Sequence, residues 1–280
     1  MQADSIRVPV GPGSIHVERY GHGGTGIILL HGFGTSGFLW RNVAPVLAEA
    51  GHTAYAVDLF GYGESDRPFD ADFGIEAQAE YLDAAMTALR VAKGVIVGVD
   101  LGGVIALRLA ATRPERVQRL VLINTPAFDE LPPKDITTMQ RSTARFAVRV
   151  TRGVLGAAPL LKSVLEGGVA DPANMPMKLV ARYLAAFAGQ NGVQHLLALA
   201  SSVRREEFED LDLASIHAPT LVVWGDQDKW LDPKLPDRLV NAIPDSRLMR
   251  VHGVARLVPE ESPEQLCELL LGFISARDQA

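Results

Sequence analysis

Short apolar segments alternate with helical patterns along most of the chain, and each segment ends in glycine, aspartate or another turn residue. Six of them are GIILLHG, AYAVDLFG, GVIVGVD, RLVLINT, TLVVWGD and RLMRVHG, which begin at residues 26, 54, 94, 119, 220 and 247. Continuously apolar strands are typical of a parallel sheet with helices on both faces. With an opening pair at 5–10 and 13–20, the pattern predicts an α/β fold with a mostly parallel, eight-stranded sheet.

The alternation stops between about Ala127 and Ile216, where the patterns are helical and no convincing strand occurs. Ninety residues are too many for a loop, so we expect a helical cap, or lid, inserted after the sixth strand. The predicted core domain is then formed by residues 1–126 and 217–280, and the cap by residues 127–216. One of its helical patterns is STARFAVRVTRGVLG, at 142–156.

Composition narrows the range of partners. Hydrophobic residues make up 48% of the chain and the formal net charge is −6, which suits a globular protein and argues against nucleic-acid or membrane partners. No secretory signal or apolar run of membrane-spanning length is visible. The one cysteine, Cys267, fits a core position. We expect a cytoplasmic monomer or homodimer that binds a small molecule, with no metal and no cofactor, because neither metal-ligand spacing nor a nucleotide-binding motif is present.

Three polar motifs follow predicted strands: His31-Gly32-Phe33-Gly34, Gly98-Val99-Asp100-Leu101-Gly102 and Gly225-Asp226-Gln227-Asp228. In doubly wound sheets, ligands bind outside the carboxyl ends of the strands, so these motifs are expected to meet in one site. Gly98 and Gly102 flank Asp100 between a strand and a helix. This is the pattern of a sharp nucleophile turn, although an ordinary helix N-cap would also read this way.

From Gly26 to Ile274 the chain resembles the α/β-hydrolase family, with the weakest likeness over the predicted cap. The resemblance places Asp100 where most members carry a serine nucleophile. It implies that the backbone N–H groups of Phe33 and Leu101 form an oxyanion hole and that Asp228 is the acid that orients the catalytic histidine. Aligned on Glu261-Ser262-Pro263-Glu264, however, the histidine position holds Arg256. A slip of the loop could instead deliver His252, which the pattern places inside the last strand.

An aspartate nucleophile is similar to that of haloalkane dehalogenases and epoxide hydrolases, in which histidine activates water to cleave an ester. The match is partial. Leu101 stands where dehalogenases hold halide with tryptophan, and the predicted cap has no tryptophan and only one tyrosine, Tyr183. Arginine stays protonated and cannot replace the base, but Arg256 could pair with Asp100, Asp228 or both.

Three functions follow from these substitutions. In the first, Asp100 performs non-hydrolytic acid/base chemistry, such as elimination, isomerisation or cyclisation, with Arg256 and the oxyanion hole stabilising negative charge. In the second, the chain is an aspartate-nucleophile hydrolase whose base is relocated, with His195 in the cap as a candidate. In the third, the protein is an inactive ligand-binding relative.

Several further residues are expected to face the substrate. Apolar walls point to a largely apolar substrate. The predicted pocket residues are His31, Gly32, Asn124, Tyr183, Phe187, His195 and Trp230, beside Phe33 and Leu101. Other roles are open for two of them, because His31 could bond backbone and Asn124 could form a turn. The charged run from Arg204 to Glu207 reads as a solvated helix face.

Overall fold

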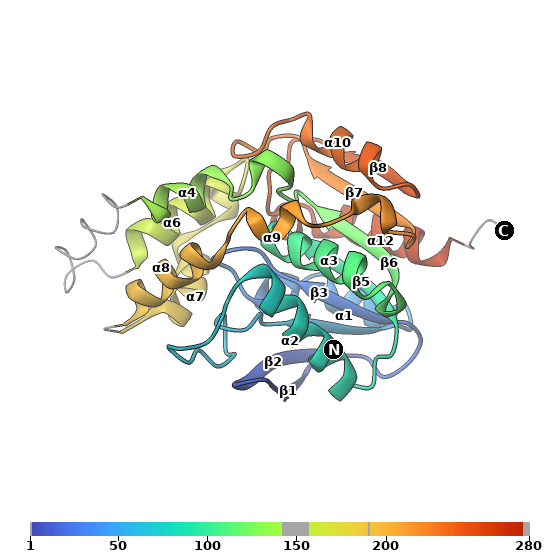
Figure 1. Ribbon diagram of the computed structural model, residues 1–280, viewed down its shortest axis with the longest axis horizontal. Coiled ribbons are helices and arrows are strands. Elements are labelled where there is room, and N and C mark those ends of the chain that lie inside the picture. The colour runs from blue at the N-terminus through green and yellow to red at the C-terminus, as the bar shows by residue number, and fades with distance from the viewer. Residues whose placement is uncertain (1, 142–156, 190, 277–280) are drawn as a thin grey trace.

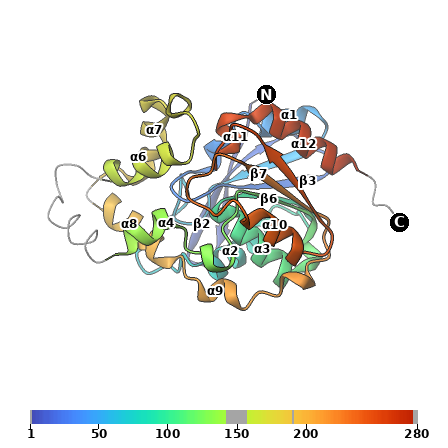
Figure 2. The same ribbon diagram turned by 90° about the horizontal axis from the view of Figure 1, so that it is seen from above.

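A computed structural model describes residues 2–141, 157–189 and 191–276. The expected helix at 142–156 lies outside these residues. Figure 1 shows a central sheet between two layers of helices, and the same layers appear from above in Figure 2. The predicted fold class is confirmed: the sheet has eight strands and is mostly parallel.

The strands lie in the order β1-β2-β4-β3-β5-β6-β7-β8. Only the β1–β2 and β2–β4 pairs are antiparallel, so β3 to β8 point their carboxyl ends to one edge. The strands are β1 (Asp4–Val10), β2 (Gly13–Tyr20), β3 (Gly26–Leu30), β4 (Thr53–Val57), β5 (Gly94–Val99), β6 (Val117–Ile123), β7 (Thr220–Gly225) and β8 (Ser246–Val251). Since β8 ends at Val251, His252 lies after the strand, and the expectation that it lies inside was wrong.

Helices cover both faces of the sheet. In Figure 2, α1, α11 and α12 lie on one side and α2, α3 and α10 on the other. The α-helices of this core are α1 (Ala44–Glu49), α2 (Ile75–Ala88), α3 (Leu101–Thr112), α10 (Leu235–Ala242), α11 (Val258–Glu261) and α12 (Pro263–Ser275), and its 3₁₀ turns are η1 (Gly37–Trp40) and η2 (Pro114–Arg116). The first ten residues of α3 are all buried, which explains why only one of them, Arg108, is charged.

Between β6 and β7 the described chain forms helices only, and we call residues 127–216 the insertion. Figure 1 shows α4, α6, α7 and α8 grouped beside the sheet. The helices are α4 (Lys134–Gln140), α6 (Ala158–Gly167), α7 (Met177–Leu184), α8 (Gly192–Ser202) and α9 (Glu206–Glu209), with the 3₁₀ turns η3 (Phe128–Glu130), η4 (Pro172–Asn174), η5 (Ala185–Phe187) and η6 (Leu213–Ser215). None of the helices in the described parts of the chain is both long and apolar enough to span a membrane.

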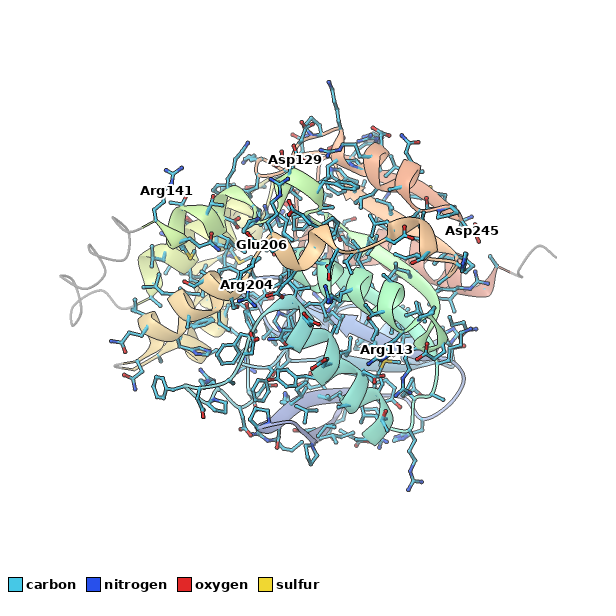
Figure 3. The ribbon with its side chains drawn as sticks, in the orientation of Figure 1. Arg113, Asp129, Arg141, Arg204, Glu206 and Asp245 are labelled. Atoms are coloured by element: carbon cyan, nitrogen blue, oxygen red, sulfur yellow. The ribbon has the colours of Figure 1, made fainter. Side chains whose placement is uncertain are left out.

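The charged run in the insertion is only partly solvated. Arg204 and Glu206 are exposed and are labelled in Figure 3. Glu207 is buried, because its carboxylate accepts the backbone N–H of Glu76 at 3.0 Å and a hydrogen bond from Arg204 at 2.6 Å. The expectation of a fully exposed face was therefore wrong at Glu207, which ties the insertion to the first turn of α2.

Candidate functional site

Asp100 occupies the turn between β5 and α3 with a strained backbone, φ 51° and ψ −121°. Two glycines make this turn sterically possible. A Cβ on Gly98 would lie 2.3 Å from the carbonyl oxygen of Gly102, and one on Gly102 would lie 2.6 Å from that of Leu30. Asp100 precedes the helix, but its side chain makes no capping hydrogen bond of the usual kind. The carboxyl group therefore does not cap the helix, and the strained backbone holds it in place for another role.

The two N–H groups expected to form an oxyanion hole both face the Asp100 carboxyl group. The backbone N–H of Phe33 donates to Asp100 Oδ2 at 2.9 Å, and the N–H of Leu101 also bonds this carboxyl. Gly32 lies against the same group, since a Cβ there would come within 2.9 Å of Oδ2. The other oxygen, Oδ1, is buried and has no hydrogen-bond partner among the described residues.

Arg256 lies at the centre of the site with its side chain 3% exposed. Its Nη1 is 3.0 Å from Asp135 Oδ2 and 3.3 Å from Asp100 Oδ1, and its Nε is 3.6 Å from Asp228 Oδ2. Its Nε and Nη2 are buried without a hydrogen-bond partner in the described structure. One guanidinium thus faces three buried carboxyl groups, which leaves the cluster short of positive charge if all three are ionised.

Asp135 was not predicted. It lies in α4 of the insertion, with its carboxyl 2% exposed, and its Oδ1 accepts the backbone N–H of Ile136 at 3.0 Å. In the sequence it stands in the stretch LPPKDITT, where an acidic residue fits the start of any helix. Only its burial opposite Arg256 distinguishes it from a surface residue, and no local pattern carries that information.

Asp228 is held by several donors. Its Oδ1 accepts the backbone N–H of Trp230 at 2.8 Å and that of Leu231 at 3.3 Å, and its Oδ2 accepts Asn124 Nδ2 at 3.0 Å. Asn124 Oδ1 in turn accepts the N–H of Gly225 at 2.8 Å. The amide of Asn124 therefore links the ends of β6 and β7 and orients Asp228.

Burial and charge set the protonation of the cluster. Burial raises the pKa of the Asp100 carboxyl; Arg256 opposes this, and the nearby charge of Asp135 adds to it. Burial disfavours the charged form of Arg256, but attraction to Asp100, Asp135 and Asp228 outweighs it and raises the guanidinium pKa. Burial and then the charge of Asp100 raise the pKa of the Tyr62 hydroxyl, so this neighbour stays neutral.

The three histidines considered for the site, His31, His195 and His252, bond elsewhere. His195 Nε2 donates to the carbonyl oxygen of Gly61 at 2.6 Å, and its ring stacks on Phe187 at a centroid distance of 6.2 Å. His252 is exposed and bonds Asp226 at 2.7 Å. His31 is buried between two backbone groups: its Nδ1 bonds the carbonyl oxygen of Gly32 at 2.8 Å, and its Nε2 accepts the N–H of Leu59 at 3.0 Å.

Two of the predicted aromatic pocket residues belong to other contacts. The Tyr183 hydroxyl donates to Glu260, whose carboxylate also pairs with Arg41. Trp230 packs on the insertion, because a Cβ on Gly167 would lie 2.7 Å from the indole nitrogen. Tyr62, which was not predicted, packs edge-on against His31 and Phe33, with centroids 5.2 and 6.3 Å apart. A pattern of aromatic residues did not reveal which rings surround Asp100.

A family model for the alpha/beta hydrolase fold matches residues 26–263. The chain belongs to the α/β-hydrolase family. A Bacillus subtilis relative described as AB hydrolase superfamily protein YfhM is 26% identical over 93% of this chain and 94% of its own length. A haloalkane dehalogenase from Mesorhizobium japonicum is 36% identical over 42% of this chain and 37% of its own length. The solved structure of the epoxide hydrolase CorEH matches with a TM-score of 0.81 at 21% identity, covering 98% of this chain and 99% of that chain.

These similarities agree on the fold and differ in chemistry. A dehalogenase, an epoxide hydrolase and a lactone-degrading enzyme are all among the similar proteins. In the described residues, no cluster of three or more His, Cys, Asp or Glu side chains has the arrangement of a metal site.

Proposed function

We propose that this α/β-hydrolase-family protein is an enzyme that performs non-hydrolytic acid/base chemistry on a small, largely apolar carbonyl compound. The observation that supports this most directly is the guanidinium of Arg256, which lies between Asp100 and Asp228. By resemblance to the family, an imidazole would stand there. Elimination, isomerisation and cyclisation all fit a site that moves protons and stabilises an enolate.

Hydrolysis through an ester on Asp100 would need a base to activate water. A guanidinium does not give up its proton at physiological pH, and its surroundings here raise the pKa of Arg256 further. The imidazoles of His195 and His252 are engaged with Gly61 and Asp226 instead. An ester formed on Asp100 would accordingly persist, which argues against a turnover that depends on it.

Proton transfer suits Asp100 better. Its Oδ2 accepts the N–H of Phe33, whereas Oδ1 has no hydrogen bond beside its 3.3 Å ion pair with Arg256 and can receive or deliver a proton. A carboxyl whose pKa is raised by burial is a stronger base when ionised and a usable acid near neutral pH. Arg256 would stabilise the negative oxygen of an enolate, as a fixed charge in a low-dielectric site.

The test is hydrogen–deuterium exchange, followed by NMR, on a panel of small neutral ketones in deuterium oxide. The wild type should exchange hydrogens next to the carbonyl, and Asp100→Asn should lose at least about 100-fold of the rate. The exposed Asp70 supplies the control substitution Asp70→Asn, which should have no effect. Equal exchange in wild type and Asp100→Asn would overturn the proposal.

A second function, aspartate-nucleophile hydrolysis, is favoured by one observation. Asp100 Oδ2 accepts the N–H of Phe33, a predicted oxyanion-hole donor, and Oδ1 has no hydrogen bond beside its ion pair with Arg256, which is close to the arrangement that an attacking carboxylate needs. Intact mass after incubation with an alkyl halide or an epoxide distinguishes the cases. Steady product release would support hydrolysis, a stable adduct would show attack without turnover, and no adduct with no ketone exchange would indicate a ligand-binding protein.

A further inference from the structure

The insertion supplies a second carboxyl group to the site, and neither the sequence motifs nor the proposed function accounts for it. Asp135 Oδ2 and Asp100 Oδ1 both lie against Nη1 of Arg256, at 3.0 and 3.3 Å. Both side chains are 3% exposed or less. The carboxyl group of Asp135, on α4, thus lies opposite the carboxyl group of Asp100 across one nitrogen atom of Arg256.

We propose that Asp135 is a catalytic residue and that it forms an acid/base pair with Asp100 for an isomerisation. This inference rests on the proposed function and specifies its reaction class. Two carboxyl groups on one guanidinium can move a proton from one carbon of a substrate to another. The reaction that needs this is migration of a double bond in a neutral β,γ-unsaturated carbonyl compound.

The environments of the two groups differ in the way an acid/base pair requires. Asp135 has hydrogen bonds to both oxygens, from Ile136 N–H and from Arg256. Asp100 Oδ1 has no hydrogen bond and lies farther from Arg256, at 3.3 Å, and burial, opposed by Arg256, raises the pKa of this carboxyl. Asp135 is therefore the base and Asp100 the acid at the start of the reaction.

The remaining charged neighbours do not compete for these roles. Asp228 faces Arg256 Nε, but its oxygens are taken by two backbone N–H groups and the amide of Asn124. The Tyr62 hydroxyl beside Asp100 stays neutral, since its pKa is raised by burial. His31 is locked between backbone groups, and burial lowers the pKa of its imidazole.

The proton transfers balance without a co-reactant. The Asp135 carboxylate removes a proton from the carbon between the carbonyl and the double bond, and the electron pair forms a dienolate whose oxygen is stabilised by Arg256. The Asp100 carboxylic acid then protonates the far carbon of the former double bond. The product is the conjugated carbonyl compound, and a proton passes from Asp135 back to Asp100 to restore the starting state.

The first test needs no substrate. It follows the Asp100 carboxyl by NMR through a pH titration of protein made with isotope-labelled aspartate. Asp100 should titrate above an ordinary carboxyl in wild type. Asp135→Asn should lower its midpoint by roughly one pH unit, because a neighbouring negative charge is removed and Arg256 is released to Asp100. The control Asp70→Asn should leave the midpoint unchanged. Equal Asp100 midpoints in all three proteins would overturn the pairing.

Activity is measured with a β,γ-unsaturated cyclohexenone, whose conjugated product is followed by ultraviolet absorbance. Asp135→Asn should lower kcat by at least about 100-fold with little change in KM, whereas Asp135→Glu should retain part of the rate and covers the case in which Asp135→Asn does not fold. Full activity in both Asp135 variants would overturn this inference while leaving Asp100 chemistry standing. No turnover by the wild type would overturn the isomerase assignment, and ketone exchange would still report separately on the proposed function.

Discussion

Two loops meet at the site, and they differ in how far they depart from the family. The turn around Asp100 retains the strained backbone, the close glycines and the facing N–H groups that the family resemblance implies for a nucleophile. The loop after β8 carries Arg256 in place of histidine and pairs it with Asp135 of the insertion. The difference teaches that the turn before α3 can keep the shape that the family resemblance implies while the loop after β8 carries a permanent cation in place of a titratable imidazole.

The largest effect is expected from placing an imidazole back in the second loop. Arg256→His would set a base beside Asp100 and Asp228, so an ester on Asp100 could be hydrolysed. We expect release of product from an alkyl halide or epoxide to rise by about 100- to 10,000-fold over wild type. Arg256→Lys, which keeps the charge without a base, is the matched control. An ester on Asp100 that persists in both variants would show that an imidazole at position 256 is not placed to activate water.

The second largest effect is expected on stability, when the guanidinium of Arg256 is removed. Arg256→Met would leave Asp135, Asp100 and Asp228 buried without a cation, and breaking such a buried pair costs about 3–5 kcal/mol. The measurement is the free energy of unfolding from urea denaturation. Arg205→Met, which removes an exposed arginine paired with the exposed Glu209, should cost less than about 1 kcal/mol. A small loss in Arg256→Met would mean that the cluster is already largely protonated.

The raised pKa of Asp100 predicts a pH dependence of stability with a definite sign. The folded protein holds a proton on Asp100 at pH values where the unfolded chain has lost it, so Asp100 lowers stability as pH rises from its unfolded value of 3.8 through its folded pKa. The free energy of unfolding falls by about 1.4 kcal/mol for each pH unit between the unfolded and the folded pKa of Asp100. Asp100→Asn should therefore become more stable relative to wild type as pH rises in this window, as measured by urea denaturation at several pH values. A constant difference would contradict the assignment of a raised pKa.

The smallest effect is expected at His252. Because its side chain is 84% exposed and pairs only with Asp226, His252→Ala should change the free energy of unfolding by less than about 1 kcal/mol. Ketone exchange should be unchanged as well, since the imidazole has no described contact with Asp100. A large loss of activity in this variant would show that a relocated histidine takes part and would favour the hydrolase alternative.

The sequence by itself determined the fold class and the sharp turn at Asp100. Apolar strands ending in glycine or aspartate, separated by helices, leave few alternatives to a parallel sheet, because both faces of such strands must be covered. The spacing of Gly98 and Gly102 about Asp100 marked a turn in which larger side chains would clash with backbone. Arg256 was found by its distance from the Glu261-Ser262-Pro263-Glu264 ending, which is also local.

Only the tertiary structure decided what surrounds these residues. Asp135 reaches Arg256 across 121 positions of sequence, and the pairing depends on how α4 packs against the loop after β8. The same packing turns Tyr183 toward Glu260 and His195 toward Gly61, away from the roles that their residue types suggested. Hydrophobic periodicity encodes which side of a helix is buried. It does not encode which residue of another element contacts that side, and here that contact brings the Asp135 carboxyl to Arg256.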